Sequence, residues 1–297
     1  MSDGSALERL TALRQYQGEG KRAPHKPLLV LLALGQLNAT GSSALEWSAV
    51  EERLGALLSE FGTSTTTGSS SAAYPFTRLR SDGVWQLSRD VPNDNVGPLN
   101  SEPIEGHFSP EIEEELSGSP AALNAVARAL VESQFPLTIA PDVLSAVGLD
   151  PDVVFSTAPT ATALAARKRD VNWRRQIVAA WDRSCAFCGF DGALGGAPVG
   201  IEAAHVRWFN FEGPDDLDNG LALCSLHHKL LDRGAIGLRD PETVIVSSAF
   251  SAVGAAGRAV YELHGRGLRP RPGTALPAPE YVMWHHAEVF KGDPLKA

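Results

Sequence analysis

All three cysteines of this 297-residue chain lie between Cys185 and Asp232, and they are spaced as metal ligands. Cys185 and Cys188 are separated by two residues, and Cys224 and His227 repeat that spacing. If the two pairs converge in space, they form a Cys3His set, which suits tetrahedral Zn²⁺. Cysteines in this spacing fit a reducing cytoplasm better than a disulfide scaffold. The sequence therefore predicts a small frame fastened by a structural zinc ion.

Length and composition indicate an ordinary soluble globular protein with two domains. The 297 residues suit two cores, and 43% hydrophobic with 21% charged residues is usual for this class. We expect a first domain over 1–150, a linker over 151–163 and a second domain over 164–297. The polar start Met1–Leu10 lacks the apolar core of a signal peptide, and Leu28–Leu34 is too short to cross a bilayer. A cytoplasmic location is therefore expected.

The formal net charge of −9 argues against a nucleic-acid partner only if the charges are evenly mixed. Basic residues instead gather in Arg9–Lys26, Arg167–Arg183 and Arg258–Arg271. Between Asp90 and Asp152 the chain has many carboxylates and a single basic residue. Segregated charge of this kind can give a positive DNA-binding face on an acidic protein, although solvated helix faces explain any one cluster equally well.

The segment after the first cysteine pair predicts the order strand, loop, strand, helix. Val199–His205 alternates like a strand, and His205 lies at its end. Arg207–Asp218 is a long loop, and Gly220–Leu223 is a second short strand. A helix then begins at a serine and ends before a glycine, over Ser225–Arg233.

Polar residues in this frame suit the hydrolysis of a phosphodiester, which needs an activated water and neutralisation of the growing phosphate charge. His205 can act as the base, because an imidazole titrates near neutrality. Asn219 does not titrate, but its amide can orient His205 through the ring or through the backbone. His228 and Asp232 are four residues apart on the predicted helix, so their side chains share one face, as two ligands of one divalent ion must.

This segment resembles the HNH (ββα-metal) nuclease family, in the version with a zinc-bound frame. His205 matches the first H, Asn219 the N and His228 the last H. The resemblance implies His205 as general base, Asn219 as its positioner and His228 as a ligand of a catalytic divalent ion such as Mg²⁺ or Mn²⁺. It also implies a structural role for the zinc ligands Cys185, Cys188, Cys224 and His227.

Two positions depart from the pattern of that family. Ala204 stands where an acidic or histidine metal ligand often precedes the first H. Metal binding would then pass to Asp232, to Glu202 or to the DNA itself. His227 stands where the fourth zinc ligand is usually a cysteine.

The first 150 residues predict a mainly helical domain with one hairpin. Tyr74–Leu87 is basic and aromatic and turns at Gly83, which predicts a β-hairpin and a winged-helix-like arrangement. The small polar tract Gly62–Ser71 predicts a mobile surface loop. Helices are expected over Leu7–Leu13, Leu28–Leu37, Trp47–Phe61 and Asp142–Val147, and after the Ser-Pro pairs that begin at Ser109 and Ser119.

The helix expected over Leu28–Leu37 is apolar on all sides, so we expect it to be buried. The residues before this helix and those in the hairpin are candidate DNA contacts. A basic lead-in, Lys21–Pro27, precedes the helix N-terminus, where a phosphate could bind. Tyr74 and Arg78 could meet a DNA backbone. The alternative is that the aromatic residues fill a small core, and for Phe76 and Trp85 we prefer the core.

This half of the chain resembles the sulfur-binding domain of phosphorothioate-dependent, McrA-type restriction endonucleases. The matching pieces are Ala-Pro-His25-Lys26-Pro-Leu-Leu and Tyr74-Pro75-Phe with its basic neighbours. The resemblance implies a shallow apolar sulfur pocket at Tyr74 and Pro75, with Lys26 holding the remaining charge near His25. Contacts to the DNA backbone or base edges would come from Arg78 and Arg80.

The physical logic of such a pocket is that sulfur is larger, more polarisable and less strongly hydrated than oxygen. An apolar contact at that position penalises an ordinary phosphate, because its oxygen would be desolvated and unpaired.

Together these patterns predict an α+β protein in which a sulfur-binding domain precedes a zinc-containing HNH nuclease domain. The expected function is a type IV-like restriction endonuclease acting on double-stranded, phosphorothioate-modified DNA. One HNH site usually cuts both strands only as a pair, so a homodimer is expected. Alternatives are an HNH restriction enzyme that reads methylated or unmodified DNA, a nicking or homing-type enzyme, and a non-catalytic zinc-stabilised DNA-binding regulator.

Overall fold

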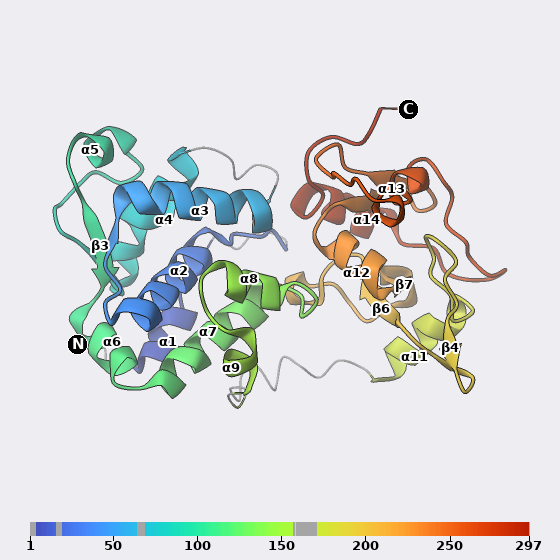
Figure 1. Ribbon diagram of the computed structural model, residues 1–297, viewed down its shortest axis with the longest axis horizontal. Coiled ribbons are helices and arrows are strands. Elements are labelled where there is room, and N and C mark those ends of the chain that lie inside the picture. The colour runs from blue at the N-terminus through green and yellow to red at the C-terminus, as the bar shows by residue number, and fades with distance from the viewer. Residues whose placement is uncertain (1–3, 16–19, 64–68, 157, 159–170, 297) are drawn as a thin grey trace. The chain divides into compact units, whose positions relative to one another are not determined.

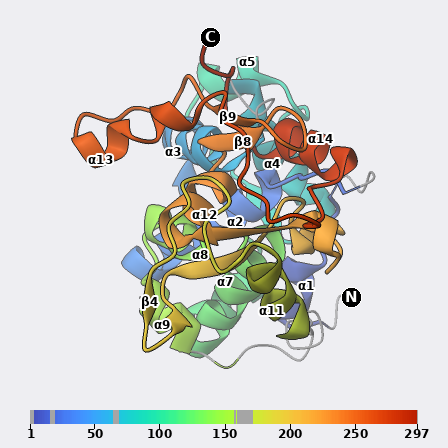
Figure 2. The same cartoon turned by 90° about the vertical axis from the view of Figure 1, so that its right-hand side faces the viewer.

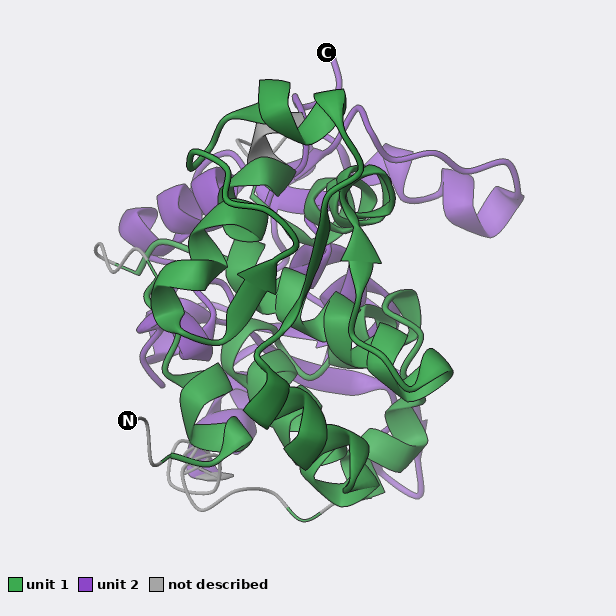
Figure 3. Cartoon of the chain, turned by 90° about the vertical axis from the view of Figure 1, so that its left-hand side faces the viewer, with its two compact units in different colours: residues 1–167 green, residues 168–297 purple. Residues whose placement is uncertain are grey.

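The computed structural model describes residues 4–15, 20–63, 69–156, 158 and 171–296. The chain divides into two compact units, Met1–Arg167 and Lys168–Ala297. Figure 1 labels their helices and strands, and Figure 3 colours the first unit green and the second purple. Each unit is described here by itself.

The first unit is built around helix α2 (His25–Thr40). Every side chain from Leu28 to Leu34 is fully buried, which confirms the prediction of a helix that is apolar on all sides. Helices packed against α2 include α3 (Trp47–Phe61), α4 (Ser69–Arg78) and α7 (Pro120–Gln134). The remaining helices of the unit are α1 (Ala6–Thr11), the 3-10 helix η1 (Leu79–Asp82), α5 (Val96–Ser101), α6 (Pro110–Ser117), α8 (Ala140–Ala146) and α9 (Pro151–Ser156).

Sequence signals for helix starts are accurate in this unit. The α3 helix has the predicted bounds, and both α6 and α7 begin with the proline of a Ser-Pro pair. In α7 the Ser119 hydroxyl accepts a hydrogen bond from the Ala122 N–H at 3.2 Å, as an N-cap residue does. The α9 helix falls within the stretch that we expected to be a linker.

The hairpin predicted over Tyr74–Leu87, on which the winged-helix-like arrangement rested, is wrong in its first arm. Residues Ser69–Arg78 form α4, and Phe76 is fully buried on the same face as Ala72 and Ala73. Helical spacing of these small and aromatic residues outweighs the alternation that suggested a strand. The start of α4 also replaces the end of the predicted loop; residues 64–68 of that loop lie outside the described residues.

A small antiparallel sheet replaces the hairpin, with β3 (Glu105–Phe108) between β1 (Leu45–Glu46) and β2 (Trp85–Leu87). Gly106 is required where the sheet meets the Trp85 ring, because a Cβ there would lie 2.5 Å from that ring. Trp85 and Phe76 are buried and their rings are in contact, so both belong to the core, as predicted.

The second unit contains helix α11 (Val171–Ala180), the antiparallel hairpin β6 (Ile201–His205) with β7 (Gly220–Cys224), and helix α12 (Ser225–Asp232). In Figure 1 the hairpin lies between α12 above and α11 below. Helix α14 packs on β8 of a further hairpin (Figure 2). The remaining elements are β4 (Ala193–Leu194), β5 (Ala197–Pro198), the 3-10 helices η2 (Phe209–Phe211), η3 (Leu217–Asn219) and η4 (Tyr261–Leu263), β8 (Ile236–Leu238), β9 (Val244–Val246), α13 (Ala255–Arg258) and α14 (Pro279–Glu288).

Side-chain contacts show that α11 and α12 cover opposite faces of the β6–β7 hairpin. His205 stacks on Trp173 of α11, and its strand partner Gly220 faces Ile177 of the same helix. Glu202, an odd number of residues away on β6, instead contacts His228 of α12. Periodicity over Ala255–Leu263 predicts a single helix, but the structure has α13 and η4 there.

Among the described residues, no helix combines the length and the apolar character needed to span a bilayer.

Candidate functional site

The predicted zinc ligands converge at one point in the second unit. One ligand atom from each of Cys185, Cys188, Cys224 and His227 lies within 4.8 Å of the other three. The His227 Nδ1 is 3.4 Å from the Cys185 sulfur and 3.2 Å from the Cys224 sulfur. Tetrahedral zinc, with Zn–S near 2.3 Å and Zn–N near 2.0 Å, places such donors about 3.5 Å apart. The donor set therefore fits Zn²⁺.

The short distances between the cysteines also change their pKa values. The hydrogen bond between Cys224 and Cys185 lowers the pKa of Cys185 well below its usual range and raises the pKa of Cys224. Burial raises the pKa of Cys188. A divalent cation among the three sulfurs would replace their remaining protons, as structural zinc sites require.

His205 is held by groups on three sides at the end of β6. Its Nε2 is 2.8 Å from Asp215 Oδ1, and its ring stacks on Trp173 with centroids 3.9 Å apart and an interplanar angle of 15°. The Phe209 ring lies 5.9 Å from the imidazole. Trp173 also donates its indole N–H to the Asp216 carbonyl at 2.9 Å, so the same side chain fixes the neighbouring loop.

Asn219 is fully buried and acts on the backbone after His205. Its Oδ1 accepts a hydrogen bond from the Arg207 N–H at 2.8 Å, and its Nδ2 donates to the carbonyls of Arg207 and Pro214 at 3.1 and 2.9 Å. Of the two routes left open by the sequence, these three hydrogen bonds use the backbone. The ring of His205 is oriented by Asp215 and Trp173 instead.

His228 lies between two carboxylates. Its Nδ1 is 2.7 Å from Glu202 Oε2, and its Nε2 is 3.3 Å from Asp232 Oδ2. Two neighbouring ligands of an octahedral ion at about 2.1 Å lie about 3 Å apart, so the His228 Nε2 and the buried Asp232 fit one coordination sphere. Glu202 is on the other ring nitrogen, where it orients the imidazole.

Glu202 is itself fixed and ionised. The Ser225 hydroxyl donates to its Oε1 at 2.8 Å. The hydrogen bond from His228, with a smaller contribution from Ser225, lowers the pKa of the Glu202 carboxyl to about 2. Ala204, which replaces an expected metal ligand, is fully buried beside it on β6.

In the first unit, His25, Tyr74 and Arg78 are brought together. The Tyr74 ring makes an edge contact with His25 at 5.8 Å, and the Arg78 guanidinium lies over the same ring at 5.2 Å. Pro75 follows Tyr74 inside α4 and is buried, whereas Tyr74 is half-buried. Burial lowers the pKa of His25, which favours a neutral imidazole in this cluster.

Lys26 points elsewhere. Its ammonium is 2.5 Å from Asp82 Oδ2 and donates to the Arg14 carbonyl at 2.9 Å, and the residue is only 5% exposed. Arg80 is tied to the loop before α5, through Asp90, the Val91 carbonyl and Asn93. The cations that we assigned to DNA therefore differ in their access to solvent.

Sequence reasoning missed Asp215, Trp173 and Asp82 as partners of the site residues. Asp215 is one of three aspartates in the loop before Asn219, and no local pattern separates it from Asp216 or Asp218. In the sequence, Trp173 is spaced with Ile177 and Trp181 as one apolar helix face, which does not indicate a contact with His205. Its stacking on His205 depends on packing between segments that are far apart in the sequence.

Comparisons with known proteins give two family matches. Residues 4–152 match the family of ScoMcrA-like DNA sulfur-binding domains, and residues 185–239 match the HNH endonuclease family. No curated protein matches the chain.

Similar solved structures include the sulfur-binding domain of ScoMcrA complexed with phosphorothioated DNA, at 20% identity and a TM-score of 0.43, covering 49% of this chain and 99% of that one. The sulfur-binding domain of SprMcrA complexed with phosphorothioated DNA is 23% identical with a TM-score of 0.40, covering 48% and 91%. The type IV phosphorothioation-dependent restriction endonuclease ScoMcrA is 21% identical with a TM-score of 0.40, covering 51% of this chain but 30% of that one.

Proposed function

The chain belongs to the family of ScoMcrA-like DNA sulfur-binding domains and also carries an HNH endonuclease domain, and from this premise we propose that it is a phosphorothioate-dependent DNA endonuclease. The first unit would recognise phosphorothioate-modified, double-stranded DNA. The second would hydrolyse phosphodiester bonds, as in a type IV restriction enzyme.

One observation supports the nuclease activity above all others. His205, Asn219 and His228 lie in order on β6, η3 and α12, next to the converged Cys3His set. A DNA-binding regulator stabilised by zinc needs the four zinc ligands alone. It has no use for a histidine clamped by Asp215 or for a second histidine set between two carboxylates.

His228 Nε2 and Asp232 would hold the catalytic divalent ion, with the oxygen and nitrogen donors that suit Mg²⁺ or Mn²⁺. When bound, such an ion neutralises the charge that grows on the phosphate and on the leaving oxygen. Glu202, ionised and fixed by Ser225, orients the His228 ring through Nδ1.

His205 would accept the proton of the attacking water. Asp215 accepts the Nε2 hydrogen, which leaves the basic lone pair on Nδ1. Trp173 keeps the imidazole plane fixed, and Asn219 holds the backbone that follows His205. These contacts orient a general base without themselves taking part in proton transfer.

The sulfur pocket would be formed mainly by the Tyr74 ring, with the buried Pro75 next to it in the sequence and the neutral His25 at its edge. Such a surface accepts weakly hydrated sulfur and leaves a phosphate oxygen desolvated and unpaired, which is the basis of selectivity. Arg78 and Arg80 lie next to this surface on α4 and η1. If each HNH site cuts one strand, a double-strand cut needs two copies of the chain. We therefore propose a homodimer on DNA.

The test is digestion of two duplexes of identical sequence, one with a single phosphorothioate, in Mg²⁺ or Mn²⁺. We expect the modified duplex to be cut and the His205→Ala variant to bind it without cutting. Equal cutting of both duplexes would favour an enzyme that reads methylated or unmodified DNA. Binding without cutting by the unaltered, zinc-loaded protein would identify a regulator.

A further inference from the structure

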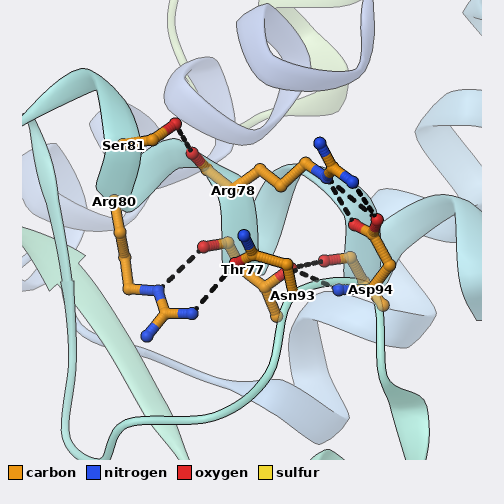
Figure 4. Close-up of polar contacts among 7 residues, drawn as sticks. Thr77, Arg78, Arg80, Ser81, Asn93 and Asp94 are labelled. Atoms are coloured by element: carbon orange, nitrogen blue, oxygen red, sulfur yellow. Dashed lines mark hydrogen bonds and ion pairs between the residues drawn. The ribbon is translucent and has the colours of Figure 1, made fainter.

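The Arg78 guanidinium is paired with a carboxylate of the same chain, that of Asp94. Its Nε is 2.9 Å from both oxygens of Asp94, and its Nη2 is 2.5 Å from Oδ2 (Figure 4). The same guanidinium lies over the Tyr74 ring of the proposed sulfur pocket, 5.2 Å from its centroid. A planar, bidentate contact of this kind is also how arginine holds a phosphate.

Asp94 is fixed in place by its backbone. Its φ of 60° is left-handed, a region that few residues other than glycine, asparagine and aspartate adopt. The Asp94 N–H donates to the Thr77 hydroxyl at 3.0 Å, and that buried hydroxyl donates to the Ala73 carbonyl at 2.8 Å. The carboxylate is thus held against Arg78 by α4 itself.

Arg80 fixes the rest of this loop. It donates to Thr77 O at 2.8 Å on α4 and to Asn93 Oδ1 in the loop at 3.0 Å (Figure 4). It also donates to Val91 O in the loop at 2.6 Å. The loop therefore cannot carry Asp94 away without breaking contacts to α4. The Arg78 and Asp94 side chains are nevertheless 45% and 39% exposed, so DNA could reach both.

The net charge of the first unit makes the Arg78–Asp94 ion pair important for the affinity for DNA. Residues 1–167 contain 11 basic and 20 acidic side chains, whereas 168–297 contain 15 of each. A DNA-binding unit with a net charge of −9 attracts ordinary phosphate weakly, and each cation that is neutralised internally reduces the attraction further.

We propose that Asp94 is an internal phosphate mimic that occupies Arg78 and holds down the affinity of the first unit for unmodified DNA. Bound DNA must exchange a backbone phosphate for the Asp94 carboxylate to use Arg78. Contact between the phosphorothioate and the Tyr74 ring then supplies the binding energy that charge does not. This inference rests on the proposed function, because it assumes that the surface beside Tyr74 meets DNA.

The experiment compares the full-length, zinc-loaded protein with its Asp94→Asn variant, binding duplexes with and without one phosphorothioate, without added divalent ion, over a range of salt concentrations. Asparagine tolerates the left-handed backbone and keeps the N–H contact to Thr77, so the variant should fold. We expect both duplexes to bind about 1.5-fold to fivefold more tightly, the range for an exposed ion pair. The slope of log K against log salt should steepen by about 0.9, one phosphate contact.

Two controls isolate the contact. Glu102→Gln removes the same charge from another exposed ion pair of the unit, with Arg89, and should change binding less. In an Arg78→Gln background, Asp94→Asn should tighten DNA binding no more than Glu102→Gln does. Weaker or unchanged binding by Asp94→Asn, or full tightening without Arg78, would overturn the inference. A wild-type protein that binds both duplexes equally would instead contradict sulfur recognition, whatever Asp94→Asn does.

Discussion

Replacement of Asn219 by alanine tests how the frame holds His205. The side chain is fully buried and makes three hydrogen bonds, one from the Arg207 N–H and two to the carbonyls of Arg207 and Pro214. At about 0.5–1.5 kcal/mol each, with the Arg207 N–H left buried, the loss is about 2–4 kcal/mol of unfolding free energy. Domains are stable by roughly 5–15 kcal/mol, so the second unit should remain folded but weakened.

The loss should appear in both stability and cleavage. Four of the six tryptophans, Trp173, Trp181, Trp208 and Trp284, belong to the second unit, so urea unfolding followed by fluorescence reports mainly on it. We expect a lower midpoint and a lower kcat, with zinc retained, because the Cys3His set is not touched.

The matched control is Asn95→Ala in the first unit, which removes a single exposed hydrogen bond from the Gly97 N–H and should leave the midpoint of the second unit and kcat unchanged. An Asn219→Ala protein with unchanged midpoint and unchanged kcat would refute the account of Asn219 as the support of the His205 loop.

Three further outcomes are expected. Cys188→Ser, or removal of zinc by a chelator, should unfold the second unit, since structural zinc supplies on the order of 10 kcal/mol; metal analysis and circular dichroism measure this. Asp215→Asn should lower kcat at least about tenfold while zinc content and DNA binding stay unchanged, because it loosens the orientation of His205; a change confined to KM would contradict this role. His25 has a folded pKa below its ordinary 6.5, so the unfolded state takes up the proton first and stability falls as pH drops through 6.5; urea midpoints near pH 7.5 and 5.5 should differ less in His25→Gln.

The sequence predicts most accurately what depends on local patterns. Ser-Pro pairs mark the starts of α6 and α7, and Trp47–Phe61 matches α3, because capping and helical periodicity act over a few residues. Spacing likewise predicts the Cys3His set, since ligands of one ion must converge. The Tyr74–Leu87 hairpin is wrong because β2 finds its partner in β3, some twenty residues later, while α4 buries Phe76.

Contacts between distant segments are not visible in such patterns. Asp215 and Trp173 reach His205 from a loop and from a preceding helix, and neither has a sequence signature. The structure shows which nitrogen of His228 each carboxylate faces, Glu202 at Nδ1 and Asp232 at Nε2, and our proposal that Asp232 holds the ion depends on this difference.

Lys26 shows how the same limitation affects the proposed sulfur site. The sequence assigned Lys26 to the DNA charge, but Lys26 and Asp82 are 6% and 4% exposed and 2.5 Å apart.

Removing one partner of a buried ion pair costs about 3–5 kcal/mol, because the other charge stays buried without compensation. Lys26→Met should therefore destabilise the first unit strongly, and Lys26→Met with Asp82→Leu should recover most of the loss. If Lys26 instead contacts DNA, the single variant would lose binding at unchanged stability, and the double variant would not regain it. Since Arg78 and Arg80 are paired with Asp94 and Asp90 in the same unit, we expect the structural outcome. Recognition would then depend on the apolar ring of Tyr74 more than on unpaired positive charge.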